Sequence, residues 1–282
     1  MSTAAQPAIA PSTTSVRTSA ERPAATHPSA RTTASTTSRT ARYALATTRQ
    51  TLTNIQFVFF TVGLPVIMFL LVNGIYGNQG PAGEVTRLNM MNMAAYGALT
   101  AAVNAGALIQ LERANGWLRQ LMVAGMTPTT FVTGKLCAAM AVVLPTILAV
   151  VAAGLLSGAD VDAPRLIGAI ALMWLLNVPM VMLGLTVGLA VKPSAVSAVA
   201  TITTILLAVV GGLWFPTLLF PDWLAEISVR SPAHWLGALP LAVLQGDPIP
   251  MQGVLTVVVW TVIIAVACVA LLRRGARTTS RR

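Results

Sequence analysis

The sequence predicts an all-α membrane protein with six transmembrane helices. Of its 282 residues, 55% are hydrophobic and 9% are charged, a balance that favours a lipid environment over a soluble core. The apolar residues are gathered in six long runs, each near the roughly 20 residues that a helix needs to cross a bilayer. Every Asp, Glu, Lys and Arg lies outside these runs, which span residues 57–76, 88–111, 136–156, 166–191, 195–220 and 254–272.

The N-terminal segment, residues 1–38, consists mainly of Ser, Thr, Ala, Pro and Arg. With so few large apolar side chains it cannot bury enough surface to offset the entropy lost on ordering. We therefore expect a disordered cytoplasmic tail. The transmembrane domain should then occupy residues 39–272, and the Arg-rich residues 273–282 should form a second, basic cytoplasmic tail.

A short amphipathic segment precedes the first run. Leu45, Leu52 and Ile55 recur near helical spacing, whereas Arg42 and Arg49 fall toward the opposite face. This pattern is typical of an interfacial helix that lies in the inner headgroup layer. A plain cytoplasmic extension of the first transmembrane helix is the alternative interpretation.

The loops between the six spans alternate between the two sides of the membrane, so each basic residue can be assigned to a side. With a cytoplasmic N-terminus, 15 of the 18 Lys and Arg residues lie inside, and only Arg87, Arg165 and Arg230 lie outside. Because basic residues concentrate on the cytoplasmic side, both termini should be cytoplasmic. This role of the cations, next to anionic lipid, also accounts for the net charge of +10 without a nucleic-acid partner. The excess of arginine over lysine is typical of proteins encoded by GC-rich bacterial genomes. It therefore favours a bacterial plasma membrane as the location of the protein.

Polar side chains inside the spans are the candidates for a substrate path, because each must find a partner or a wet cavity. Hydrogen bonding between helices is the alternative explanation for each of them. A path without charged side chains suits an apolar or amphipathic cargo, such as a drug, natural product or lipid-like molecule, although transport of a sugar polymer or peptide stays open. The candidates are Asn73, Asn92, Asn104 and Asn177.

The loop after the second run carries the clearest functional pattern. Trp117, Leu118, Leu121, Met122 and Gly125 form one apolar stripe at helical spacing before a proline ends the segment. Such a short helix could insert into a groove on a soluble partner, or it could lie on the lipid surface. The pattern alone favours the lipid surface.

This loop resembles the coupling-helix region of ABC-2 type transporter permeases, the membrane subunits of certain ATP-driven exporters. In that family an acidic-basic pair is followed by a glycine, a leucine-rich turn, a proline, and a glycine-lysine pair that opens the third span, here Gly134 and Lys135. Ala114 stands where a second acidic residue often follows the arginine. The resemblance implies coupling to an ATPase through Glu112, Arg113, Gly116, Trp117, Leu118, Leu121 and Pro128.

A second stretch, between the fifth and sixth runs, resembles the same family. There the family has a glycine, a proline and short helices before the last span. Physically, the prolines break the helix and the tryptophans are typical of a membrane interface. The resemblance implies re-entrant or interfacial outer helices, and an ordinary outer loop anchored by aromatic residues is the alternative. The matching residues include Gly212, Pro216, Pro221, Trp223 and Pro232.

The resemblance also implies how the protein is energised. The sequence contains no GxxxxGK[ST] phosphate-binding loop, so we expect neither a catalytic site nor a cofactor on this chain. ATP and Mg would be bound by a separate nucleotide-binding subunit. Two copies of that ATPase subunit would dock against two permease subunits, arranged as a homodimer or a heterodimer, and would drive export.

An ion-coupled secondary carrier or channel, which needs no ATPase, is the alternative function. Proton-coupled carriers commonly use ionisable side chains at membrane depth, and the six runs contain none. Sodium coupling through backbone oxygens stays open. Cys137 and Cys268 have no metal-binding spacing, so no metal site is expected.

Overall fold

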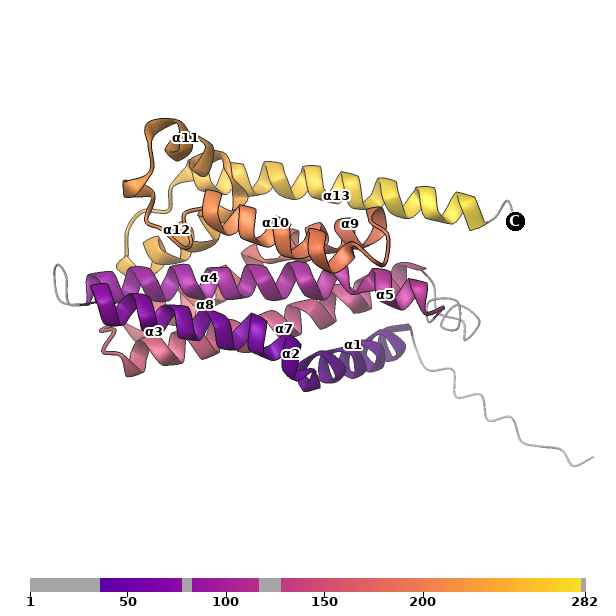
Figure 1. Ribbon diagram of the computed structural model, residues 1–282, viewed down its shortest axis with the longest axis horizontal. Coiled ribbons are helices and arrows are strands. Elements are labelled where there is room, and N and C mark those ends of the chain that lie inside the picture. Colours follow the sequence, from indigo (N-terminus) through magenta and orange to yellow (C-terminus); the bar gives the residue numbers. More distant parts are fainter. Residues whose placement is uncertain (1–35, 78–82, 117–127, 280–282) are drawn as a thin grey trace, which may run out of the picture. The chain divides into compact units, whose positions relative to one another are not determined.

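The structure is a computed structural model, and it describes residues 36–77, 83–116 and 128–279. All the regular secondary structure in these residues is helical (Figure 1). The helices are α1 (Thr36–Thr53), α2 (Ile55–Val58), the π-helix η1 (Phe59–Gly63), α3 (Leu64–Tyr76), α4 (Glu84–Ala107), α5 (Ile109–Ala114), α7 (Pro128–Leu156), α8 (Ala163–Leu176), α9 (Val178–Ala190), α10 (Val196–Val210), the 3₁₀ helix η2 (Thr217–Leu219), α11 (Asp222–Arg230), α12 (Pro232–Gln245) and α13 (Met251–Thr279).

Five helical stretches of the described chain are long and apolar enough to cross a membrane. They overlap five of the six predicted runs, and each begins a few residues earlier than the run. The fourth stretch contains two helices, α8 and α9, which meet at Asn177 just before Pro179. The five stretches are Ile55–Tyr76, Glu84–Glu112, Thr130–Leu156, Ala163–Ala190 and Met251–Leu272.

The prediction of a continuous helical span over residues 195–220 is wrong. The helix α10 ends at Val210 after 15 residues, about 22 Å at 1.5 Å per residue, which is shorter than the hydrocarbon core of a bilayer. The chain then turns at Gly212, whose φ of 74° lies in the left-handed region that glycine adopts without strain. Beyond this turn, only the short helix η2 forms before Phe220.

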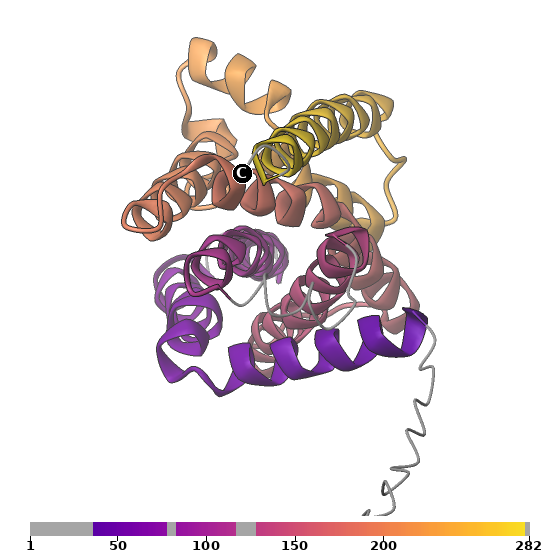
Figure 2. The ribbon, with the colours of Figure 1, turned by 90° about the vertical axis from the view of Figure 1, so that its right-hand side faces the viewer.

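The helix α1 begins at Thr36, so almost all of the predicted tail at residues 1–38 lies outside the described residues. Figure 2 shows the long helices nearly end-on, with α1 running across them. The helix packs on α7, and its Leu45 and the following Ile55 are exposed. An amphipathic helix in this orientation agrees with the interfacial prediction, which itself stays a prediction. At the other terminus, α13 continues to Thr279 through most of the predicted basic tail.

The centre of the helical domain is α4, which packs against α3, α7, α9, α10 and α12. Its contact with α9 is close because both helices carry glycines there. A Cβ added to Gly106 would lie 2.5 Å from the carbonyl oxygen of Val181, and one added to Gly184 would overlap the carbonyl oxygen of Val103. Small residues that let two backbones touch are typical of membrane helix pairs, so this crossing fixes α4 relative to α9.

Candidate functional site

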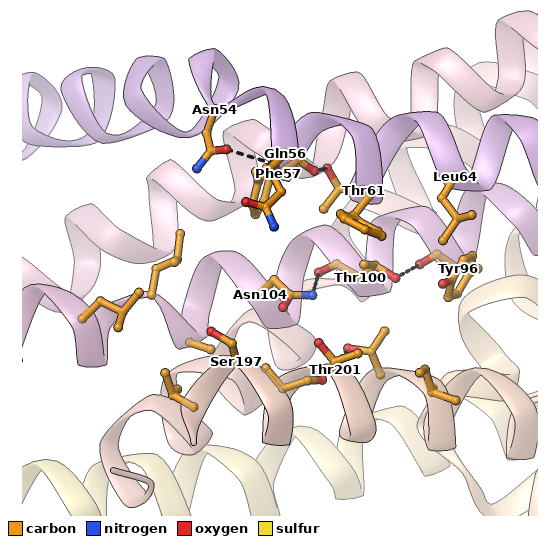
Figure 3. Close-up of a pocket in the computed structure, with 18 of the residues that line it drawn as sticks. Asn54, Gln56, Phe57, Thr61, Leu64, Tyr96, Thr100, Asn104, Ser197 and Thr201 are labelled. Atoms are coloured by element: carbon orange, nitrogen blue, oxygen red, sulfur yellow. Dashed lines mark hydrogen bonds between the residues drawn. The ribbon is translucent and has the colours of Figure 1, made fainter. Parts of the chain in front are cut away.

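An open groove of about 640 Å³ lies between the first membrane stretch, α4 and α10 (Figure 3). The helix α4 contributes Tyr96, Thr100 and Asn104 to its wall, and Leu108 and Leu111 follow along the same direction. From the other elements, the lining residues are Asn54, Gln56, Phe57, Phe60, Thr61 and Leu64 on one side, and Val196, Ser197, Ala200, Thr201, Thr204, Ile205 and Trp214 on the other.

The groove lining combines hydroxyl and amide groups with aromatic rings. None of the described residues that line it is Asp, Glu, Lys, Arg or His. The rings of Tyr96 and Trp214 meet edge to face, with their centroids 5.3 Å apart. The indole Nε1 of Trp214 is buried and has no hydrogen-bond partner in the described structure. The described lining therefore provides hydrogen-bonding groups but no charged side chain.

Of the four asparagines predicted to form a substrate path, Asn104 lines the groove and the other three do not. Asn177 is fully buried, and its Nδ2 donates to the carbonyl oxygen of Met173 at 2.8 Å. The Oδ1 of Asn73 is buried without a partner in the described residues. Asn92 lies close to Gly237 of α12. These three side chains therefore lie outside the groove.

The substrate-path prediction misses most of the polar lining, because it includes asparagine and leaves out threonine and serine. A usable signal was present. Thr100 and Asn104 are four residues apart, as are Ser197 and Thr201, so each pair lies on one helix face. Polar residues at this spacing inside an apolar run indicate a helix side that faces a cavity or another helix.

A second cluster lies beside the predicted coupling loop. The ammonium Nζ of Lys135 on α7 lies 2.5 Å from Oε1 of Glu112 on α5, and the hydroxyl of Tyr43 on α1 donates to Oε2 of Glu112 at 3.0 Å. The Lys135 side chain is 2% exposed and that of Glu112 is 23% exposed. The Tyr43 ring also packs on Phe131, with the centroids 5.4 Å apart. The cluster thus joins three helices.

Burial and the adjacent carboxylate of Glu112 raise the pKa of Tyr43 above its usual value. The phenol therefore stays protonated and acts as the donor. The resemblance assigns Glu112 to contact with an ATPase, whereas the structure directs its carboxylate toward Lys135 and Tyr43. Lys135 also lies within the third membrane stretch, because that helix begins before the apolar run.

The apolar stripe of the predicted coupling helix, with Trp117, Leu118 and Leu121, lies outside the described residues. The residues on both sides of it are described. Arg113 belongs to α5, Gly116 has a φ of 71°, and Pro128 is the first residue of α7. A glycine in the left-handed region and a proline at the first helical position are ordinary signals for the end and start of helices.

The predicted outer segment contains short helices, as the resemblance implies, at the end of the domain opposite α5 (Figure 1). Pro216 precedes η2, Pro221 precedes α11, and Pro232 begins α12. Trp223 is 64% exposed. The indole of Trp235 donates to the carbonyl oxygen of Val229 at 2.8 Å and so joins α12 to α11.

His234 lies where α12 passes the end of α10. Its Nδ1 is 3.3 Å from the carbonyl oxygen of Gly211 and 3.4 Å from Oγ of Ser228. Burial lowers its pKa, so the neutral ring is favoured and serves to hold these segments together.

Comparison with known proteins agrees with this architecture. The family model for the ABC-2 type transporter matches residues 40–241. The protein named "Putative transport permease YvfS" from Bacillus subtilis (strain 168) is 18% identical over 223 residues, which cover 78% of this chain and 91% of that protein. The family match spans most of α1, the groove, the cluster of Tyr43, Glu112 and Lys135, and the short helices η2 and α11. The chain is therefore a multi-pass membrane protein that belongs to the ABC-2 type transporter family.

Proposed function

We propose that this chain is the permease subunit of an ATP-driven exporter and that its cargo passes through the groove beside α4. The observation that carries the proposal is the groove itself, which is about 640 Å³ in volume and has no charged side chain among its described lining residues. Such a cavity matches the size of a drug-like ligand site. An uncharged lining favours an amphipathic drug, natural product or lipid-like molecule.

The proposed energy source is a separate ATPase subunit that binds ATP and Mg. Two copies of it would engage two permease subunits through the segment around Leu121, and either a homodimer or a heterodimer fits. The ion pair of Glu112 and Lys135 joins the two ends of that segment. The ends of α5 and α7 therefore share one anchor, which suits a segment that must transmit force.

The proposed topology has six spans in a bacterial plasma membrane, with both termini in the cytoplasm. The helix α10 would be the fifth span. It is 15 residues long, and its crossing would be completed by the re-entrant or interfacial helices η2, α11 and α12. The charge bias of the loops supports this orientation, because Arg87, Arg165 and Arg230 are the three basic residues that it leaves outside.

The coupling segment can be tested by replacing Leu121 with aspartate and Arg113 with alanine, each in the full-length protein. Since a few central residues dominate a protein interface, either change should reduce the recovered ATPase about tenfold or more. The measurement is affinity purification in mild detergent, followed by identification of the co-eluting chains and an ATPase assay. Membrane insertion should be unchanged.

The matched control is Leu218→Ala, because Leu218 is 92% exposed in η2, at the end of the domain far from α5. It should leave the recovered ATPase unchanged. A stable wild-type oligomer that elutes without any ATP-binding subunit would contradict the proposal, and an ion-coupled carrier or channel would then be the better explanation.

A further inference from the structure

Several hydrogen-bond donors along the middle of the groove are engaged within their own helices. Four of its polar side chains donate to backbone carbonyl oxygens four residues earlier in their own helices, and these side chains come from η1, α4 and α10. The bonds run from Oγ1 of Thr61 to Phe57 (2.8 Å), from Oγ1 of Thr100 to Tyr96 (2.8 Å), from Nδ2 of Asn104 to Thr100 (2.9 Å) and from Oγ1 of Thr204 to Ala200 (2.8 Å).

A threonine hydroxyl has one donor and two lone pairs, and an amide oxygen has only lone pairs. Once its donor is engaged in its own helix, each of the three hydroxyls can only accept a hydrogen bond from a cargo. Asn104 keeps its Oδ1 as an acceptor, and its amide also keeps one N–H as a donor. Figure 3 shows Ser197 and Thr201 on the wall opposite Asn104 and Thr100, and their hydroxyls can rotate to accept as well. The middle of the groove is therefore rich in acceptors.

Further side-chain donors lie toward the two ends of the groove. Asn54 and Gln56 are exposed on or beside α2, and the Asn54 Oδ1 is engaged as the cap that accepts from the Phe57 N–H at 3.1 Å. Tyr96 and Trp214 form the aromatic pair, and the Trp214 N–H is buried. An anionic group in the middle of the groove would meet more lone pairs than free N–H or O–H donors, and no cation among the described lining residues.

A cationic or strongly donating group would meet favourable surroundings in the same place. The carbonyl-type and hydroxyl oxygens accept its N–H bonds, and aromatic faces attract cations. Phe57, Phe60, Tyr96 and Trp214 supply four rings to the lining. The absence of a carboxylate from the described lining means that such a cargo would be held without a strong ion pair, which suits its later release.

We propose that the groove selects amphipathic amines, with the protonated amine donating to acceptors among Thr61, Thr100, Asn104 and Thr204 and the aromatic or aliphatic body lying against the rings. This inference names the substrate class of the proposed transport function and rests on it. The groove would discriminate by hydrogen-bond direction. It would bind a cargo group that donates hydrogen bonds and disfavour a group that can only accept them.

The test uses two fluorescent probes that share a dansyl group and a flexible chain. Dansylcadaverine ends in a primary ammonium, and N-dansyl-6-aminohexanoate ends in a carboxylate. Binding to the purified permease in phosphatidylcholine nanodiscs is followed by dansyl emission, with empty nanodiscs subtracted. Loss of the charge-assisted hydrogen bonds should make the carboxylate probe bind about tenfold more weakly or worse. Equal or tighter binding of the carboxylate probe would overturn the inference.

The double variant Thr100→Val/Thr204→Val removes two acceptors while keeping side-chain shape, and the carbonyl oxygens that lose a side-chain partner keep their helical bonds. It should weaken dansylcadaverine binding about tenfold, as expected for two hydrogen bonds. The control is Thr146→Val, because Thr146 makes the same kind of bond, to Val142 at 3.2 Å, but is fully buried and does not line the groove.

The control should change the affinity less than about twofold, since it removes no acceptor from the groove. An equal loss in Thr146→Val, or none in the double variant, would refute the assignment. These measurements need neither ATPase nor nucleotide. If neither probe binds above empty nanodiscs, the cargo inference fails on its own, whereas recovery of the ATPase subunit decides the proposed function separately.

Discussion

Replacing Glu112 with alanine is expected to destabilise the protein by about 3–5 kcal/mol, the usual result when one partner of a buried ion pair is removed. The substitution leaves the Lys135 ammonium, which is 2% exposed, without a counter-ion and removes the acceptor of the Tyr43 hydroxyl. A buried cation without a partner is costly because it has lost its hydration. Equilibrium unfolding by SDS in mixed micelles measures the change.

The chain provides a matched control for this prediction. Glu226 pairs with Arg230 at 2.6 Å, but both side chains are mostly exposed. Because exposed pairs contribute little, Glu226→Ala should cost no more than about 1 kcal/mol. A second substitution, Lys135→Met in the Glu112→Ala background, should recover much of the lost stability, since it removes the unpaired charge. Similar small effects at Glu112 and Glu226 would show that the buried pair is solvated.

Replacing Gly184 with alanine is expected to destabilise the protein by about 1–3 kcal/mol, the range for added volume in a packed interior. The new methyl group would overlap the carbonyl oxygen of Val103 on α4. Backbone atoms cannot rotate away as a side chain can, so α4 and α9 must separate. That movement would also loosen the neighbouring contact at Gly106. The same SDS titration measures the loss.

The control is Gly74→Ala on α3, where a Cβ would meet nothing within 4 Å. There the substitution should stabilise the helix by about 0.5–1 kcal/mol, because alanine loses less backbone entropy than glycine. The two glycine variants should therefore differ in sign. A stabilising effect of alanine at both positions would mean that the close crossing of α4 and α9 is not maintained in the folded protein.

Hydropathy predicted five of the runs because each overlaps a long apolar helical stretch, one of which divides into α8 and α9 at Asn177. It failed over residues 195–220, where apolar composition continues past the end of α10. The helix ends at Val210 before Gly211 and Gly212, and a hydropathy average gives glycine, proline and phenylalanine no conformational meaning. Mean hydropathy therefore does not indicate the backbone turn at Gly212.

The candidate site was less predictable, because it depends on contacts between distant segments. Glu112 and Lys135 were recognised in the sequence, but their pairing and the participation of Tyr43 follow from the packing of α1, α5 and α7. In the groove, only Asn104 was predicted. Threonine was overlooked because hydropathy scores it as nearly neutral, although its hydroxyl decides which hydrogen bonds a cavity can make.

The contact between Glu112 and Lys135 has a thermodynamic consequence for the segment between them. The two residues are 23 positions apart in sequence, so their contact closes that segment into a non-covalent ring. Bringing two such positions together in the folding chain costs entropy, which grows only slowly with their separation in sequence. This chain entropy is lost when the permease folds, before any partner binds. A partner that binds this closed segment would therefore lose less chain entropy than one that binds the same residues in a linear peptide, and would retain more of its contact energy as affinity.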